Sequence, residues 1–325
     1  PPHKHTPPAP RGRRLCFRPT SLRRRPGPPS DRQIPRPAVS YPSHHDAPPV
    51  RWHHRDVHSP LPLAALDYAA SRTASRPPLV ILHGLLASSR HWRTVASELA
   101  SQGPAFALDL RNHGRSPRST AMDFPVMVED LLAWLDRRGL HRIDLLGHSM
   151  GGKLAMAFAC RHPDRVRRLV VVDIAPRLYR TPSHVPEFRA MHELRLDSLR
   201  SRADAEMRLE GRVPDPAMRR FLAGNLERDE HSGAWRWSFD LFALTAALPE
   251  LKNSPLAPHD RFAGPALFLA GERSPYIRPE DQPLIRAHFP AARLVRLPRS
   301  GHNPHLESRA DFLAALESFL ASYVA

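Results

Sequence analysis

Short apolar runs alternate with amphipathic stretches from about residue 56 onward. Apolar runs bounded by turn residues predict buried strands, and an apolar period near 3.6 residues predicts helices that cover them. We expect strands at 79–83, 105–110, 143–146, 169–173, 266–270 and 292–297, and helices at 91–101, 125–138, 150–161, 280–288 and 309–323. A weaker extended pair is expected within 57–70. This alternation is typical of an α/β fold with a mostly parallel central sheet flanked by helices.

One stretch interrupts the alternation. Residues 177–256 contain helical patterns at 188–199, 203–210, 216–226 and 239–248, and we expect no strand among them. A segment of this size between two core strands commonly forms a lid over the carboxyl edge of the sheet. We therefore expect one domain at 56–325 with a helical lid at about 177–256.

The first 55 residues differ from the rest in composition. They hold twelve Lys and Arg against two acids, Asp31 and Asp46, and 14 of the 37 prolines, whereas the whole chain has a net charge of +16. Such a segment buries too little apolar surface to offset its ordering entropy, so we expect residues 1–55 to be a disordered basic extension. It could bind nucleic acid or an anionic membrane surface, or act as an organelle address. We favour a solvated extension without a specific partner, so nucleic acid is not an expected partner.

Length and composition exclude several classes of protein. The 325 residues, 41% of them hydrophobic, suffice for one large domain. No run of 18 apolar residues occurs, so no membrane-spanning helix is expected, and the start of the chain, at Pro1, has no apolar signal-peptide core. Cys16 and Cys160 form neither a disulfide framework nor a zinc motif. We expect a soluble, cytoplasmic protein without a metal or a cofactor.

A motif for nucleophilic catalysis lies between the strand at 143–146 and the helix at 150–161. Residues 147–151 read Gly-His-Ser-Met-Gly, which is G-x-S-x-G in a strand-turn-helix context. Glycines two residues on either side allow strand and helix to approach each other around a strained serine. Ser149 is therefore the candidate nucleophile.

A serine hydroxyl needs a base, and the base needs an acid that orients it. His302 follows the last predicted strand at the same sheet edge as Ser149, so it is the candidate base. Asp173 ends an apolar strand directly after the nucleophile helix and is favoured as the acid. Glu272 is the alternative, because in many folds of this kind the acid follows the next core strand, where this chain has serine at 274.

The remaining site residues follow from the same edge of the sheet. Two backbone N–H groups must hold the oxyanion of an acyl intermediate, and those of Leu85 and Met150 are the candidates. His83 and His148 lie in loops at this edge, and Trp237 lies in the predicted lid. We expect these three side chains to contact substrate.

Several segments of the chain resemble the α/β-hydrolase superfamily. They are Leu-His-Gly-Leu at 82–85, Asp-Leu-Arg-Asn-His-Gly-Arg-Ser at 109–116, Gly-His-Ser-Met-Gly-Gly-Lys at 147–153, Val-Asp-Ile-Ala-Pro at 172–176 and Ser-Pro-Tyr at 274–276. Together they are similar to the branch of small bacterial acyl esterases and thioesterases and their mitochondrial abhydrolase-domain relatives. The resemblance implies an acid at Asp173, explains the serine at 274, and implies catalysis without a metal or cofactor.

These observations predict a serine hydrolase of carboxylic esters or acyl thioesters with short to medium acyl chains, working through an acyl-enzyme intermediate. A carbon–carbon bond hydrolase, a perhydrolase or an acyltransferase could use the same catalytic triad and oxyanion hole. From a different class, the chain could bind nucleic acid or a membrane surface through residues 1–55. That alternative leaves Ser149, Asp173 and His302 unexplained.

Overall fold

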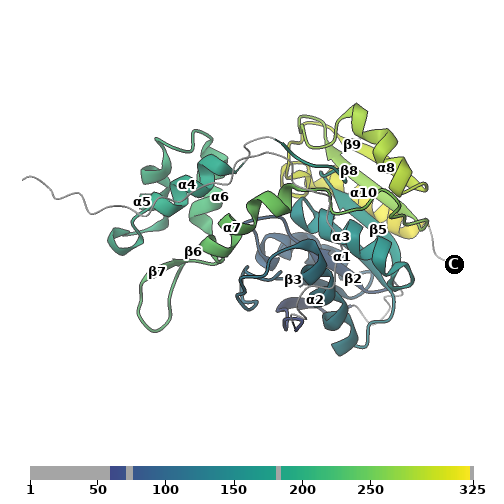
Figure 1. Ribbon diagram of the computed structural model, residues 1–325, viewed down its shortest axis with the longest axis horizontal. Helices are drawn as coiled ribbons and strands as arrows, with labels where there is room; N and C mark the ends of the chain where they lie inside the picture. Colours follow the sequence, from purple (N-terminus) through teal and green to yellow (C-terminus); the bar gives the residue numbers. More distant parts are fainter. Residues whose placement is uncertain (1–58, 71–75, 181–183, 323–325) are drawn as a thin grey trace, which may run out of the picture. The chain divides into compact units, whose positions relative to one another are not determined.

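A seven-stranded sheet organises the part of the chain that the computed structural model describes, residues 59–70, 76–180 and 184–322 (Figure 1). The predicted extension at 1–55 lies outside these residues. Strand β1 pairs antiparallel with β3, and all other neighbours in the sheet are parallel. The order is β1-β3-β2-β4-β5-β8-β9, formed by Ala65–Tyr68, Ala105–Leu108, Leu79–Leu82, Ile143–His148, Val166–Val172, Ala266–Gly271 and Ala292–Leu297.

Helices cover both faces of this sheet, because successive side chains of a buried strand point to opposite faces. In β2, Leu79 and Ile81 belong to one apolar cluster, and Val80 and Leu82 belong to the other. The first cluster includes side chains of α1 (Arg93–Leu99) and α10 (Arg309–Ala321). The second includes side chains of α2 (Phe124–Arg137), α3 (Met150–Arg161) and α8 (Gln282–His288). The expected mostly parallel sheet with flanking helices is confirmed.

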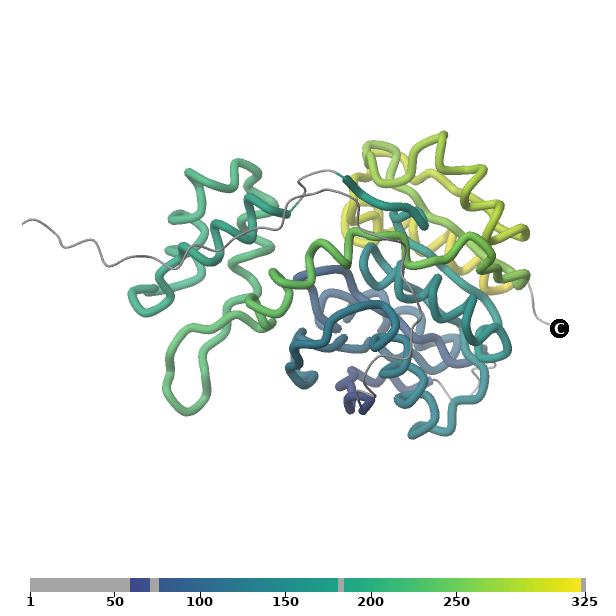
Figure 2. The backbone as a smooth tube through the Cα atoms, viewed as in Figure 1, coloured from purple at the N-terminus to yellow at the C-terminus, as the bar shows by residue number. Residues whose placement is uncertain are grey.

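The segment between β5 and β8 leaves the sheet and returns to it, as Figure 2 shows. Its helices are α4 (Val185–Glu193), α5 (Arg202–Leu209), α6 (Pro216–Gly224) and α7 (Leu241–Lys252). The last of these begins at an N-cap, Asp240, whose carboxylate accepts a hydrogen bond from the N–H of Ala243 at 3.0 Å. Helix α7 ends where the chain rejoins the sheet domain.

Two details of the prediction are wrong. The segment was expected to lack strands, but β6 (Leu226–Arg228) and β7 (Trp235–Trp237) form an antiparallel hairpin. Strands of three residues are too short to show an alternating pattern, and the indole N–H of Trp235 anchors this hairpin to the carbonyl of Leu199 at 2.8 Å. Instead of an extended pair near the start of the domain, residues 59–70 contain β1 as their one strand, and its partner is the distant β3.

The carboxyl ends of β2, β4, β5, β8 and β9 meet at one edge, because parallel strands all point the same way. The register pairs Gly147 of β4 with Leu82 of β2 and with Val171 of β5. The turns after these strands are thereby brought together. They carry Ser149 after β4 and Asp173 after β5.

Candidate active site

Ser149 stands on a strained turn between β4 and α3. Its backbone has φ 52° and ψ −117°, a region that non-glycine residues rarely occupy. A Cβ at Gly147 would lie 2.1 Å from the carbonyl oxygen of Gly151, and a Cβ at Gly151 would lie 2.4 Å from that of Leu82. Only glycine fits at both positions, so the G-x-S-x-G pattern reflects steric necessity. The turn leaves the Ser149 hydroxyl at the edge of the sheet.

A chain of hydrogen bonds links the serine to a histidine and an aspartate. The Ser149 hydroxyl lies 3.0 Å from Nε2 of His302, and Nδ1 of His302 lies 2.8 Å from Oδ2 of Asp173. A carboxylate only accepts hydrogen bonds, so the imidazole proton belongs on Nδ1 and leaves Nε2 as an acceptor for the serine O–H. The structure therefore brings together the three residues expected from the sequence. Their arrangement can activate a hydroxyl as a nucleophile.

Asp173 is fully buried, and three hydrogen bonds hold its carboxylate. Besides His302, it accepts from the N–H of Gly271 at 3.0 Å and from the hydroxyl of Ser274. In many folds of this kind an acid stands near position 274, but here that position is a serine. Its hydroxyl donates a hydrogen bond to Asp173, which follows the neighbouring strand β5. This role of Ser274 was not expected from the sequence. Glu272 is exposed and accepts instead from the N–H of Arg299 at 3.2 Å.

Two main-chain N–H groups lie beside Ser149. Met150 is the first residue of α3, so its N–H points out of the positive end of the helix. Leu85 follows Gly84, where an added Cβ would lie 2.9 Å from Nδ1 of His148, so glycine permits the close approach of this loop. In the described part of the chain, neither N–H donates to a protein acceptor. Both residues line the same cavity as Ser149.

The three expected substrate contacts do not line this cavity. His83 is buried between two loops: its Nδ1–H donates to the carbonyl of Gly84 at 2.8 Å, and its Nε2 accepts from the N–H of Leu110 at 3.0 Å. His148 donates from Nε2 to the carbonyl of His302 at 2.8 Å, which positions the loop of the candidate base. Burial lowers the pKa of His83 to about 4 and that of His148 well below its usual value, so both are neutral at pH 7.

Trp237, the third expected contact, belongs to hairpin strand β7 and is buried. Its indole stacks on the ring of Phe239, with centroids 5.5 Å apart and ring planes at 10°. The aromatic side chain therefore packs within the inserted segment. Its sequence position could not distinguish this packing from substrate contact.

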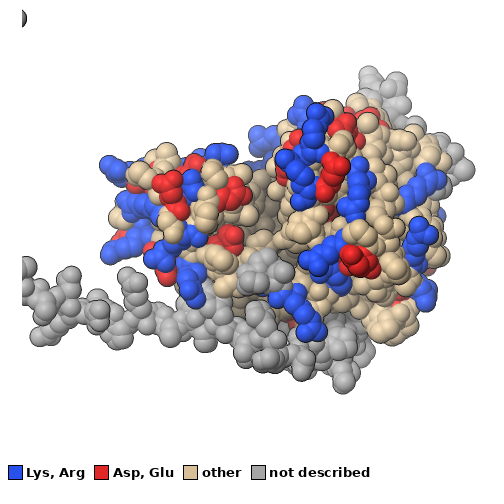
Figure 3. Space-filling view, turned by 90° about the horizontal axis from the view of Figure 1, so that it is seen from above, with Lys and Arg blue, Asp and Glu red and all other residues tan. Residues whose placement is uncertain are grey.

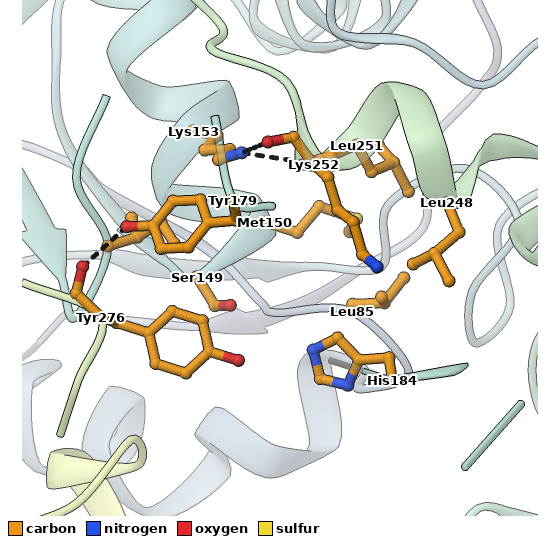
Figure 4. Close-up of a pocket in the computed structure, with 11 residues that line it drawn as sticks. Leu85, Ser149, Met150, Lys153, Tyr179, His184, Leu248, Leu251, Lys252 and Tyr276 are labelled. Atoms are coloured by element: carbon orange, nitrogen blue, oxygen red, sulfur yellow. Dashed lines mark hydrogen bonds between the residues drawn. The ribbon is translucent and has the colours of Figure 1, made fainter. Parts of the chain in front are cut away.

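A small cavity adjoins Ser149, with a volume of about 50 Å³ (Figure 4). Apolar side chains form much of its wall, and α7 supplies part of it. The sequence did not lead us to expect five of its polar lining residues, which are Lys153, Tyr179, His184, Lys252 and Tyr276. Two of them, Lys153 and Tyr276, lie in the segments that resemble the α/β-hydrolase superfamily. The lining residues are Leu85, Ser149, Met150, Lys153, Ile174, Tyr179, His184, Leu248, Leu251, Lys252 and Tyr276.

Lys153 joins the nucleophile helix to the end of α7. Its buried Nζ donates to the carbonyl oxygens of Leu251, Lys252 and Asn253 at 3.1, 2.9 and 2.6 Å. The last carbonyls of a helix have no partner within the helix, so this side chain caps α7. Burial holds the pKa of Lys153 well below its usual value. The inserted segment is thus attached one helical turn after Ser149.

The described residues show neither a metal site nor a membrane span. In 59–70, 76–180 and 184–322, no group of three or more His, Cys, Asp or Glu side chains is placed to hold a metal ion. Within the same ranges, no helix has both the length and the apolar character needed to cross a bilayer.

Comparison with known proteins assigns this chain to a family. The family model described as alpha/beta hydrolase fold matches residues 77–308. The chain belongs to the alpha/beta hydrolase fold family. A solved structure of a marine microorganism esterase superposes on this alpha/beta hydrolase with a TM-score of 0.75 at 35% identity, covering 80% of this chain and 99% of that one.

Two curated relatives match similar parts of this alpha/beta hydrolase. The sn-1-specific diacylglycerol lipase ABHD11 of Mus musculus is 35% identical over 255 residues, which are 76% of this chain and 82% of the relative. Esterase YbfF of Escherichia coli (strain K12) is 30% identical over 251 residues, 77% of this chain and 96% of that protein. The resemblance to bacterial esterases and abhydrolase-domain proteins is thereby confirmed.

Proposed function

We propose that this protein is a serine hydrolase that cleaves carboxylic esters and acyl thioesters through an acyl-enzyme intermediate. The observation that carries the proposal is the continuous hydrogen-bond chain from the Ser149 hydroxyl through His302 to the buried carboxylate of Asp173. The names of the relatives, esterase and lipase, support ester hydrolysis as the reaction.

The geometry suggests a role for each group. The Ser149 oxygen attacks the acyl carbonyl while Nε2 of His302 takes its proton, and the side chain of Asp173 stabilises the imidazolium. The N–H groups of Leu85 and Met150 hold the oxyanion. His302 then gives the proton to the leaving alcohol or thiol and activates the water that releases the acid.

The size of the cavity favours the short end of the range of acyl chains. The cavity of about 50 Å³ lies directly beside Ser149 and has room for the first few heavy atoms of an acyl chain. The apolar wall from Leu85, Leu248 and Leu251 suits the hydrocarbon part of such a group. We therefore propose esters and thioesters of short to medium acyl chains as substrates.

We test this with p-nitrophenyl esters from acetyl to long acyl chains and with the matching acyl thioesters, each compared with Ser149→Ala. We expect the wild type to hydrolyse the short esters and the variant to lose this activity. The optimum chain length then measures the pocket. Equal rates for the wild type and Ser149→Ala would remove Ser149 as the nucleophile.

We further propose that residues 177–256 act as the lid of the domain at 56–325, because α7 forms part of the cavity wall.

The basic residues 1–55 are not needed for the proposed chemistry, and a chain without them should keep its turnover number. On the face seen in Figure 3, Lys and Arg are interspersed with Asp and Glu. Some basic side chains of the inserted segment form ion pairs, for example Arg208 with Asp204. This mixture does not favour nucleic acid as a partner, and the expected cytoplasmic location stays a prediction.

A further inference from the structure

His184 stands directly before helix α4, but its side chain does not serve that helix. Its backbone has φ 71° and ψ −13°, a left-handed conformation that few residues other than glycine adopt. The residue at this N-cap position commonly accepts a hydrogen bond from the helix through a Ser, Thr, Asp or Asn side chain, and the imidazole of His184 makes no such bond. The carbonyl of His184 accepts from the N–H of Phe188 at 2.9 Å, so the first turn of α4 holds its backbone. The helix itself therefore does not require an imidazole at this position.

The imidazole of His184 instead forms part of the wall of the cavity beside Ser149. In Figure 4 the ring extends from its backbone into the space between Leu85, Ser149 and Tyr276. Among the residues that the structure describes, no protein group forms a hydrogen bond with the ring nitrogens of His184. These nitrogens can therefore bond a molecule that enters the cavity.

The ring of His184 is neutral at pH 7. Burial, together with the nearby charges of His302 and Lys252, lowers its pKa to about 4. A neutral imidazole has one N–H donor and one acceptor nitrogen. A hydroxyl group donates and accepts, so it can bond either nitrogen, whereas a carbonyl or ether oxygen can only accept. The apolar side chains of Leu248 and Leu251 suit the carbon atoms next to such a hydroxyl.

We propose that His184 determines substrate specificity by binding a hydroxyl group of the substrate, a few bonds from the scissile carbonyl. This inference rests on the proposed ester hydrolysis and names a feature of its substrate class. The cavity of about 50 Å³ that His184 lines adjoins Ser149, so the hydroxyl lies close to the bond that is cleaved. A hydroxyacyl ester presents the hydroxyl on the acyl side, and a monoester of a small diol presents it on the alcohol side.

The experiment compares esters in which a hydroxyl takes the place of a methyl group of similar size. On the acyl side, methyl 3-hydroxypropanoate is paired with methyl butyrate. On the alcohol side, 2-hydroxyethyl acetate is paired with propyl acetate. Hydrolysis is followed by pH-stat titration, and each kcat/KM is divided by the rate constant for alkaline hydrolysis of the same ester, which corrects for intrinsic reactivity. The quantity compared is the ratio of this corrected value for the hydroxy ester to that for its methyl partner.

Three variants are compared with the wild type. His184→Leu removes both ring nitrogens and keeps a side chain of similar size, whereas His184→Gln keeps a donor and an acceptor. His231→Leu is the matched control, because it makes the same change at an exposed position of the inserted segment that does not line the cavity. Thermal melting and circular dichroism show whether each variant is folded.

We expect the wild type to prefer the hydroxy ester in one of the two pairs. In His184→Leu this ratio should fall by about three- to tenfold, as for the loss of one hydrogen bond between uncharged groups. It should be largely retained in His184→Gln and stay at the wild-type value in His231→Leu. The pair that responds identifies the acyl or the alcohol side as the one that carries the hydroxyl.

Several results would overturn the inference while the ester hydrolase stands. One is that the esters are hydrolysed but the wild type prefers the hydroxy ester in neither pair, a result that needs no variant to fold. Another is a ratio that is the same in the wild type and His184→Leu. A ratio as low in His184→Gln as in His184→Leu would show that hydrogen bonding by His184 does not select the substrate.

Failure of the proposed function gives a different result. In that case the wild type hydrolyses none of the four esters faster than Ser149→Ala does, and the preference for a hydroxyl falls together with the ester hydrolase.

Discussion

The ring of Tyr276 lies flat on the imidazole of His302, with centroids 3.9 Å apart and ring planes at 21°. The backbone of Tyr276 is held in turn by Tyr179, whose hydroxyl donates to the Tyr276 carbonyl at 2.7 Å and accepts from the N–H of Ala175 at 2.8 Å. The stack restricts the imidazole to the plane in which it reaches both Ser149 and Asp173. An aromatic face also stabilises the imidazolium that forms when His302 takes a proton.

Replacing Tyr276 by Ala should therefore lower kcat more than it raises KM. We expect a loss of about tenfold in kcat, the scale of one stacking or cation–π contact, measured with p-nitrophenyl acetate. Tyr276→Phe keeps the ring and should restore most of kcat. If the Phe variant is as slow as the Ala variant, the hydroxyl and not the stack matters.

Asp173→Asn should reduce kcat by about 10⁴-fold, the loss typical of a triad whose acid no longer fixes the histidine tautomer. An Asn amide group would also meet the donors of Gly271 and Ser274 with fewer acceptors than the carboxylate has. Glu272→Gln is the matched control at the other position considered for the acid, and it should cost little because Glu272 is exposed. The opposite pattern in steady-state assays would move the acid to Glu272.

Lys153→Met should destabilise the fold and lower activity together. The substitution leaves the buried carbonyls of Leu251, Lys252 and Asn253 without their shared donor, and we expect a loss of about 1–3 kcal/mol in the free energy of unfolding by urea. Arg161→Met, on the exposed side of the same helix, should stay within about 0.5 kcal/mol of the wild type. An unchanged urea midpoint in Lys153→Met would show that α7 does not depend on this cap.

Stability should decline as pH falls below 6.5. Burial lowers the pKa of His83 to about 4 and that of His305 to about 3, whereas unfolded histidines titrate near 6.5. Below pH 6.5 the unfolded chain binds more protons than the native chain, so the stabilisation present above 6.5 is lost progressively toward pH 4 and 3. Urea midpoints at pH 7.5, 6 and 5 measure this decline.

His305→Phe provides the control for this pH dependence. The imidazole of His305 stacks on Trp92 at 4.2 Å between centroids and 9° between planes, so a phenyl ring can keep the packing while removing the titrating group. The urea midpoint of the variant should fall less steeply between pH 7.5 and 5. Midpoints that are the same at all three pH values in the wild type would contradict the argument.

Much of this protein can be read directly from local sequence. The alternation of apolar runs predicts the parallel sheet because each strand or helix needs only its own few residues to show which face is buried. The signal for Ser149 is equally local, because the G-x-S-x-G pattern occupies five consecutive residues. Strand direction then places the turns that carry Asp173 and His302 at the same edge.

Contacts between distant segments were decided only by the tertiary structure. The hydroxyl of Ser274 reaches Asp173 across 101 residues of sequence, and Lys153 reaches the end of α7 across 98. The same packing gives Asp173, and not Glu272, to His302. It also directs the imidazoles of His83 and His148 to loop carbonyls, where they hold the loops in place. Lys252, by contrast, lines the cavity. Local pattern specifies which face of an element is buried, but the partner on that face depends on how the elements pack, and no single segment encodes that packing.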